Sequence, residues 1–139
     1  DSNQHRIVCW RTGWEMIKAH PLLGLGPEIV HRDVLKYVPA DIPRPLPEGW
    51  YGHLHSIYVH YAAERGVAAL LFLLWMFAKI LADFRRAARE QVFLHGLIAV
   101  VIAVMIEGAF ELNLGDSEVL AMFLTVVACG YLTLEQTAT

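Results

Sequence analysis

Charged residues are scarce in this chain, and they show no strong excess of either sign. Only 18% of its 139 residues are Asp, Glu, Lys or Arg, the formal net charge is −3, and 56% are hydrophobic. An average soluble domain has about 25% charged and roughly 45–50% apolar residues. Without a basic excess we expect no nucleic-acid partner, and the shortage of charge favours a protein that contacts lipid.

Cysteine is nearly absent as well. Cys9 lies in a polar segment and Cys129 within an apolar run, so we expect no disulfide between them. We also expect no secretory signal peptide at this start, because Asp-Ser-Asn-Gln-His is not a basic stretch followed by an apolar core. This polar start, without Met, runs straight into a helical pattern, and we therefore expect a piece of a longer protein.

Long apolar runs fill the second half of the chain. They predict three transmembrane helices at about residues 60–82, 92–110 and 119–134. Basic side chains near the ends of such helices can reach the membrane surface. The alternative interpretation is a soluble helical bundle with unusually apolar core helices.

The connections between these runs favour the membrane. Arg85, Arg86 and Arg89 lie between the first two runs, whereas the turn 111–118 has no basic residue. Basic loops stay on the cytoplasmic side of a membrane. Residues 1–56 are therefore predicted to be an extracytoplasmic segment, and residues 57–139 a membrane domain whose C-terminal tail lies inside.

An amphipathic helix is expected at about residues 6–20. Its apolar stripe consists of Ile7, Trp10, Trp14 and Ile17, and its polar face carries Arg11, Glu15 and Lys18. A helix with Trp on its apolar face suits a membrane interface, although packing on a domain core would explain the stripe equally well. A turn with Gly24 and Gly26 and a Pro-rich loop at 39–47 follow. The predicted fold class is thus an all-α membrane protein, with an interfacial helix and a Pro-rich loop before three transmembrane helices.

Three histidines, His53, His55 and His60, occur where the Pro-rich loop leads into the first apolar run. They could be metal ligands, but no Cys or carboxylate lies close by in the sequence to complete a site. They could instead be structural groups at the membrane surface. A third interpretation makes His55 an acid–base group, since an imidazole titrates near neutral pH.

The order of the motifs resembles the C-terminal part of the O-antigen ligase and O-antigen polymerase superfamily. The motifs are Arg6-x3-Trp10, then Met16-Ile-Lys-Ala-His-Pro-Leu-Leu-Gly-Leu-Gly-Pro27, then His53-Leu-His-Ser56 with Gly66 nine residues on, and Phe110-Glu-Leu-Asn-Leu-Gly-Asp-Ser-Glu-Val119. In the family, such a chain forms part of a large periplasmic loop and the last transmembrane helices. Ser56 replaces the more usual Asn, Ala69 replaces a second Gly, and the many N-terminal helices of the family are missing.

The resemblance implies a bacterial inner-membrane enzyme that transfers a glycan from undecaprenyl diphosphate to an acceptor hydroxyl in lipopolysaccharide O-antigen or related surface polysaccharide assembly. The acceptor would be a glycan or a lipid A-core-type molecule. His55, supported by His53, would act on that hydroxyl. Arg6 is the best match to the family's diphosphate-binding arginine, because a guanidinium can bind phosphate through two N–H donors at once. Arg11 and Lys18 are weaker candidates on the same helix.

Glu64 and Arg65 would line the cavity or pair with each other at the interface. Diphosphate is already a good leaving group, so the resemblance implies no cofactor and no metal. The rival interpretation is a non-enzymatic membrane transporter or assembly scaffold with structural histidines. An enzyme would require His55 and Arg6 to converge on one site, and a scaffold would not.

Overall fold

The structure, a computed structural model, describes residues 2–88 and 91–138, and within these ranges it contains helices and no strands. The predicted all-α fold class is therefore confirmed. Its elements are α1 (Ser2–Ala19), α2 (Ile29–Asp33), the 3₁₀ turn η1 (Val34–Lys36), α3 (Ile57–Ala87), α4 (Val92–Glu107), the 3₁₀ turn η2 (Asn113–Gly115) and α5 (Ser117–Ala138). Arg89 of the predicted cytoplasmic loop lies outside the described residues.

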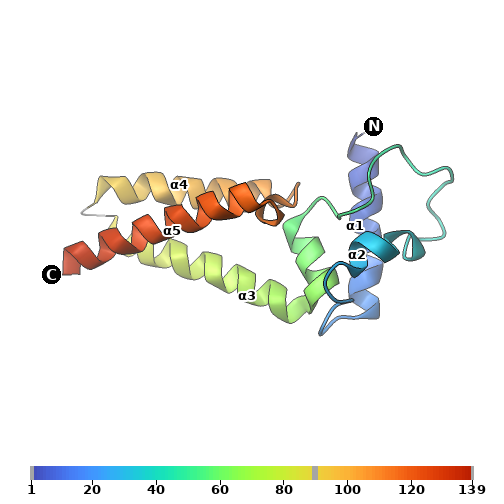
Figure 1. The fold of residues 1–139 in the computed structure, drawn as a ribbon, viewed down its shortest axis with the longest axis horizontal. Coiled ribbons are helices and arrows are strands. Elements are labelled where there is room, and N and C mark those ends of the chain that lie inside the picture. The colour runs from blue at the N-terminus through green and yellow to red at the C-terminus, as the bar shows by residue number, and fades with distance from the viewer. Residues whose placement is uncertain (1, 89–90, 139) are drawn as a thin grey trace.

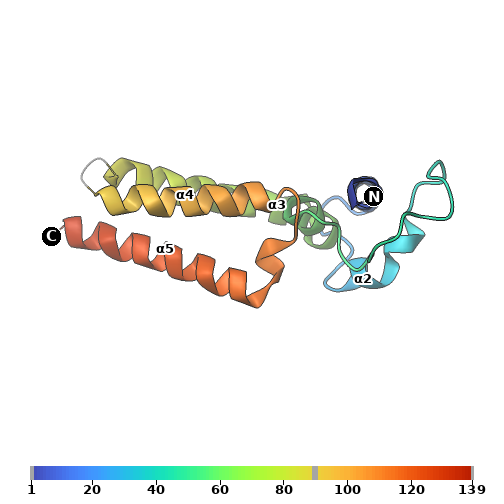
Figure 2. The same cartoon turned by 90° about the horizontal axis from the view of Figure 1, so that it is seen from above.

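Helices α3, α4 and α5 run side by side, and α1 crosses one end of this bundle at a steep angle (Figures 1 and 2). The bundle core is aromatic and aliphatic, with Phe77, Phe84, Leu94, Val101 and Phe123 almost fully buried. Because α1 lies across the bundle axis, it would run along the surface of a membrane that the bundle crosses.

Among the residues that the structure describes, two helices are long and apolar enough to cross a membrane. The qualifying segments are Ile57–Ala87 and Ser117–Gln136, and only 22% and 11% of their most apolar windows are buried. The core helix of a soluble bundle would be mostly buried, so these exposed apolar surfaces suit lipid or further helices. Helix α4 has only 16 residues, because the chain turns after Glu107, where the amides of Phe110 and Glu111 both bond to the Glu107 carbonyl. The span predicted at about residues 92–110 therefore stays a prediction.

Helix α1 packs through a different face from the stripe seen in the sequence. Its buried side chains include Cys9, Thr12 and Met16, whereas Ile7 is 53% and Trp14 59% exposed. Gly13 explains the choice of face, since a methyl group there would collide with Val59 and Leu54. The small residues let α1 approach closely. Of the stripe, Ile7 and Trp14 stay exposed, whereas Trp10 donates to the His55 carbonyl and Ile17 packs against the buried side chains of this face.

Gly66 breaks α3 into two segments that point in different directions. Its φ of 85° and ψ of 166° are not helical, and a side chain at this position would collide with the carbonyl of Leu22. The turn after α1 fills the break. The amides of Leu25 and Gly26 donate to the carbonyls of Ala63 and Glu64 at 2.9 and 2.8 Å, and the Val67 amide donates to Pro21 at 2.8 Å.

The first span predicted from the sequence, at about residues 60–82, contains this point, so its helix is kinked at Gly66. The carbonyls and amides freed by the break are satisfied by the turn, so the interruption leaves these groups paired. This contact also explains why a Gly-x-Gly turn and a later Gly occur together, because both must allow two backbones to touch.

A second set of hydrogen bonds joins the start of α3 to the end of α4. The Ile57 amide donates to the Gly108 carbonyl at 2.8 Å, and the Tyr58 hydroxyl donates to the Met105 carbonyl at 2.6 Å. The turn that follows α4 is therefore held beside the loop that precedes α3.

We expect Gly66→Ala in the full-length protein to lower the free energy of unfolding by about 2–4 kcal/mol, from left-handed strain and the clash with the turn. Gly96→Ala is the matched control, because nothing lies within 4 Å of a methyl group there. Thermal unfolding in detergent measures both. Equal midpoints for the two variants would contradict this account of the break.

We expect the bundle to place its α1 end outside and the end of α3 inside the cytoplasm. In a cysteine-free background, an impermeant thiol reagent should label Ala40→Cys and Ser117→Cys, both at exposed positions, in intact spheroplasts. Gln91→Cys, at the start of α4, should react only after lysis. Labelling of Gln91→Cys in intact cells would reverse the orientation.

Candidate functional site

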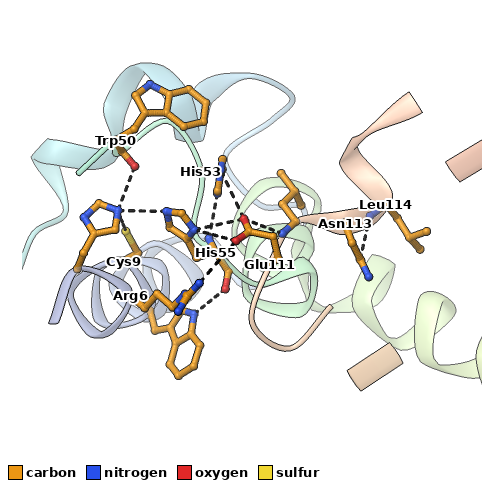
Figure 3. A network of polar contacts seen from close by, with 11 residues as sticks. Arg6, Cys9, Trp50, His53, His55, Glu111, Asn113 and Leu114 are labelled. Atoms are coloured by element: carbon orange, nitrogen blue, oxygen red, sulfur yellow. Dashed lines mark hydrogen bonds and ion pairs between the residues drawn. The ribbon is translucent and has the colours of Figure 1, made fainter. Parts of the chain in front are cut away.

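Three segments that are far apart in the sequence meet where α1 crosses the bundle. Helix α1 contributes His5 and Arg6, the loop before α3 contributes His53 and His55, and the turn after α4 contributes Glu111 (Figure 3). Their side chains form one polar cluster, which we call the histidine–Glu111 cluster.

His55 lies at the centre of the histidine–Glu111 cluster in a backbone conformation that is rare for a residue with a side chain. Its φ is 45°, a left-handed value that persists only when neighbouring groups hold it. The Trp10 indole N–H donates to the His55 carbonyl at 3.0 Å, and the His55 amide donates to Nδ1 of His53 at 3.2 Å. These contacts fix the direction of the His55 ring.

The ring of His55 lies between a histidine and a carboxylate. Its Nε2 is 3.1 Å from Nε2 of His5, and its Nδ1 is 3.3 Å from a carboxylate oxygen of Glu111. An ionised carboxylate accepts hydrogen bonds only, so Nδ1 of His55 carries a proton and Nε2 is left as the basic nitrogen. A carboxylate that orients an imidazole in this way also stabilises its protonated form.

His5 supports this arrangement. Its Nε2 lies 3.1 Å from the Trp50 carbonyl, which can only accept, so the His5 proton is on Nε2 and is shared with His55. Burial lowers the pKa of His5, and the neighbouring His55 and Arg6 lower it further. Nδ1 of His5 is buried without a partner among the described residues. His5 is therefore neutral near pH 7.

Glu111 is the common neighbour of the other groups. One oxygen lies 3.7 Å from Nε2 of His53 and the other lies 3.9 Å from Nη2 of Arg6. The pKa of His53 is lowered, mainly by burial and then by His55, against the opposing effect of Glu111. A single carboxylate thus faces two imidazoles and a guanidinium.

A cleft of about 600 Å³ opens beside this cluster. It is lined by Glu28, His31, Trp50, Gly52, His53, His60, Tyr61, Glu64, Arg65, Glu111, Leu112, Leu114, Gly115, Asp116 and Leu120. His53 and Glu111 face the cleft, whereas His55 and Arg6 are not part of its wall. Of the two histidines that the sequence analysis assigned to the acceptor hydroxyl, His53 is thus the one in the wall of the cleft.

Glu64 and Arg65, which the sequence predicted to line a cavity or to pair, do both. Each lines the cleft, and Nε of Arg65 lies 3.6 Å from Glu64. The Glu64 carboxylate is buried, accepts the Glu28 amide at 2.7 Å and lies 3.6 Å from Nε2 of His60. Their functional role stays a prediction.

Arg11 and Lys18 do not join the cluster. Arg11 donates two hydrogen bonds to Asp41, at 2.8 and 3.0 Å, and Lys18 donates to Glu15 at 2.8 Å. Both cations are paired on the surface of α1, so of the three predicted phosphate ligands the structure gathers only Arg6 with the histidines.

His5 and Glu111 were missed by the sequence analysis. Glu111 falls within the last motif that carries the family resemblance, and His5 lies four residues before Cys9, on the buried face of α1. That spacing was the available signal for His5. It was hidden because the tryptophan stripe on another face was taken as the informative one.

The donor set for a metal is richer than the sequence suggested. Cys9 and Glu111 do lie near the histidines, and two groups bring their ligand atoms within 4.8 Å of one another: His5, Cys9 and His55, and His53, His55 and Glu111. The first group is a poor site, because burial raises the pKa of the Cys9 thiol to about 12 and a thiol binds metal as the thiolate. In the second, the His55 amide donates to Nδ1 of His53, which leaves Nε2, 3.7 Å from Glu111, as the ligand atom of His53.

The fold and the cluster define a membrane-associated helical protein with a histidine–carboxylate site at one end of its bundle. The model of the O-antigen ligase family matches residues 1–74, more than half of the chain. The chain therefore belongs to the O-antigen ligase family, as its motifs predicted, and membership implies a glycosyltransferase-like enzyme in general. No curated protein and no solved structure matches the chain.

We expect the full-length protein to hold no stoichiometric metal and to keep its activity in a chelator, because Glu111 already has two imidazoles and a guanidinium as partners. Elemental analysis of purified protein, before and after dialysis against EDTA, measures this. A stoichiometric metal that leaves together with activity, and that is absent from His53→Ala, would instead assign the second group as its site.

Proposed function

We propose that this chain is part of a bacterial inner-membrane enzyme that transfers a glycan from undecaprenyl diphosphate to an acceptor hydroxyl. The product would be lipopolysaccharide O-antigen or a related surface polysaccharide, made by a ligase or a polymerase. Family membership supports the reaction class. The observation that carries the proposal is the meeting of His55, Glu111 and Arg6 on one site.

In this reaction His55 acts as the general base. The His5 N–H, shared between the Trp50 carbonyl and Nε2 of His55, turns wholly to the carbonyl and frees that Nε2. Nε2 of His55 then accepts the proton of the acceptor hydroxyl while the hydroxyl oxygen attacks the anomeric carbon of the donor, and the bond from that carbon to the diphosphate oxygen breaks. The electron pair of this bond leaves with the diphosphate. Glu111, 3.3 Å from Nδ1 of His55, stabilises the imidazolium that forms, as a carboxylate does beside other catalytic histidines.

His53 is the group that we propose to guide the acceptor. Its ring centroid is 4.1 Å from that of His55, and it lines the cleft. An acceptor that enters through the cleft meets His53 first and then reaches the nitrogen that His55 shares with His5.

Arg6 is proposed to hold the leaving diphosphate. Its Nη2 lies 3.9 Å from Glu111, too far for a hydrogen bond, and its Nε has no partner among the described residues. Because Nε is buried, Nη2 is the donor that a phosphate oxygen can reach, and the Arg6 side chain is one-third exposed. Arg11 and Lys18 remain secondary candidates, since each would first have to leave its carboxylate partner.

The arrangement in the membrane completes the proposal. Residues 1–56 would be periplasmic, and α4 together with the turn residues up to 110 would form the second of three spans. The donor lipid, the acceptor and the bilayer would then all meet at the end of the bundle where α1 lies. The transporter or scaffold alternative does not require Arg6, His53 and His55 to surround one carboxylate, and that convergence favours the enzyme.

We expect His55→Ala in the full-length protein to reduce glycan transfer by about 10²–10⁴-fold, the usual contribution of a general base. Arg6→Lys should also be strongly impaired, because an ammonium keeps the charge but loses the paired donors. Glu111→Gln should fall between wild type and His55→Ala, since it keeps the shape but loses the charge that stabilises the imidazolium. Transfer of lipid-linked glycan in membranes measures all three.

Matched controls are His20→Ala and Arg32→Lys. His20 is exposed at the end of α1, and Arg32 pairs only with Asp33 at the surface. His31 does not serve as a control, although it lies outside the sequence motifs, because it lines the cleft. Normal transfer by His55→Ala, at a normal protein level, would remove the acid–base role and favour the scaffold.

A further inference from the structure

The cleft beside His53 differs in charge from the Arg6 side of the cluster. Four carboxylates line it, those of Glu28, Glu64, Glu111 and Asp116, and Arg65 is the one cation among its lining residues. The Arg65 guanidinium already faces Glu64 at 3.6 Å and lies over the Tyr61 ring, 4.9 Å from its centroid. Like charges close together repel, so this cleft is unsuited to a diphosphate and suited to a neutral, hydrogen-bonding ligand.

Two of these carboxylates are free to accept hydrogen bonds. The side chains of Glu28 and Asp116 make no hydrogen bond or ion pair within the described parts of the chain. An ionised carboxylate is an acceptor only. The ligand that fits such a wall therefore carries several hydroxyl donors.

Trp50 adds an apolar face to the same cleft. Its ring is held at one edge by His53, at a centroid distance of 4.9 Å, and lies 5.8 Å from the ring of His31, yet 59% of the residue is exposed. A rigid aromatic face with polar acceptors around it binds ligands that have an apolar face and a polar rim. A pyranose ring has this character, with C–H groups on its faces and hydroxyls at its edge.

We propose that the cleft is the binding site for the acceptor glycan, with Trp50 as the stacking face and Glu28 and Asp116 as hydroxyl acceptors. The proposal rests on the proposed function and deepens it. Figure 3 shows Trp50 and His53 on one side of the His55–Glu111 pair and Arg6 on the other. The acceptor and the diphosphate are thus held on different sides of the cluster with the anomeric carbon between them, so that the hydroxyl can attack that carbon on the face opposite the leaving diphosphate.

The first experiment measures binding without any donor. Delipidated surface glycan from the bacterium that carries the protein is titrated into the full-length protein in nanodiscs, and the heat of binding is followed. Trp50→Ala and Asp116→Asn should each weaken binding by about tenfold, whereas Trp50→Phe, which keeps an aromatic face, should restore most of it. Trp14→Ala is the matched control, because Trp14 is also 59% exposed but lies on α1, outside the cleft.

The second experiment measures transfer with each substrate varied in turn. Trp50→Ala should raise the KM for the acceptor about tenfold and leave the KM for the lipid-linked donor within about twofold of wild type. A raised donor KM with an unchanged acceptor KM would overturn the proposal and assign the cleft to the donor. Equal binding by Trp50→Ala and Trp14→Ala would overturn it as well.

The two experiments separate this inference from the proposed function. Glycan binding that is lost in Trp50→Ala, in a protein that transfers no glycan, would support the glycan site and contradict the reaction. Transfer that is insensitive to Trp50 and Asp116 would support the reaction and contradict the site.

Discussion

The structure depends on one contact between two stretches of backbone. The turn after α1 lies in the break of α3 at Gly66, and three hydrogen bonds between main-chain groups hold it there. No side chain fits between the two stretches at Gly24 or Gly66. Because the contact is made by main-chain atoms, it fixes the height and angle at which α1 crosses the bundle, and with them the positions of His5 and Arg6.

The geometry of the site depends on this contact and on the hydrogen bond between the Ile57 amide and the Gly108 carbonyl. The first contact positions α1, and the second positions the turn that carries Glu111. His55 lies between them, and its left-handed backbone is held by Trp10 and His53. Strained backbone usually persists where several surrounding elements hold it in place. The left-handed backbone of His55 therefore indicates a site that is held by several elements.

The helices could be predicted from the sequence because their apolar runs are long and few other structures accommodate them. The break at Gly66 could not, since Glu64-Arg-Gly-Val-Ala reads locally as helix and a single glycine there is tolerated. Only the turn that fills the break makes it favourable, and that turn lies about 40 residues earlier in the sequence. The backbone conformation at Gly66 is therefore set by a tertiary contact and not by the local sequence.

The candidate site could be predicted only in part, because only some of its residues lie in local sequence motifs. His53, His55 and Arg6 were recognised because each belongs to a motif with its own spacing. His5 and Glu111 contact His55 although they lie 50 and 56 residues away in the sequence. No local sequence pattern predicts a contact over such a separation. Arg11 and Lys18 were expected near the phosphate because they share a helix with Arg6, but each has a nearer carboxylate, and a helix turns its successive residues in different directions.

The burial of Cys9 has a consequence for the chemistry of the thiol. Its side chain is fully covered between α1 and the rest of the cluster, and burial raises its pKa to about 12. Oxidants and disulfide exchange act on the thiolate, and almost none is present at neutral pH. A reduced cysteine can therefore persist beside the site even in an oxidising compartment, where an exposed thiol would be captured by a second cysteine. The packing of α1 protects this thiol from oxidation without any partner cysteine.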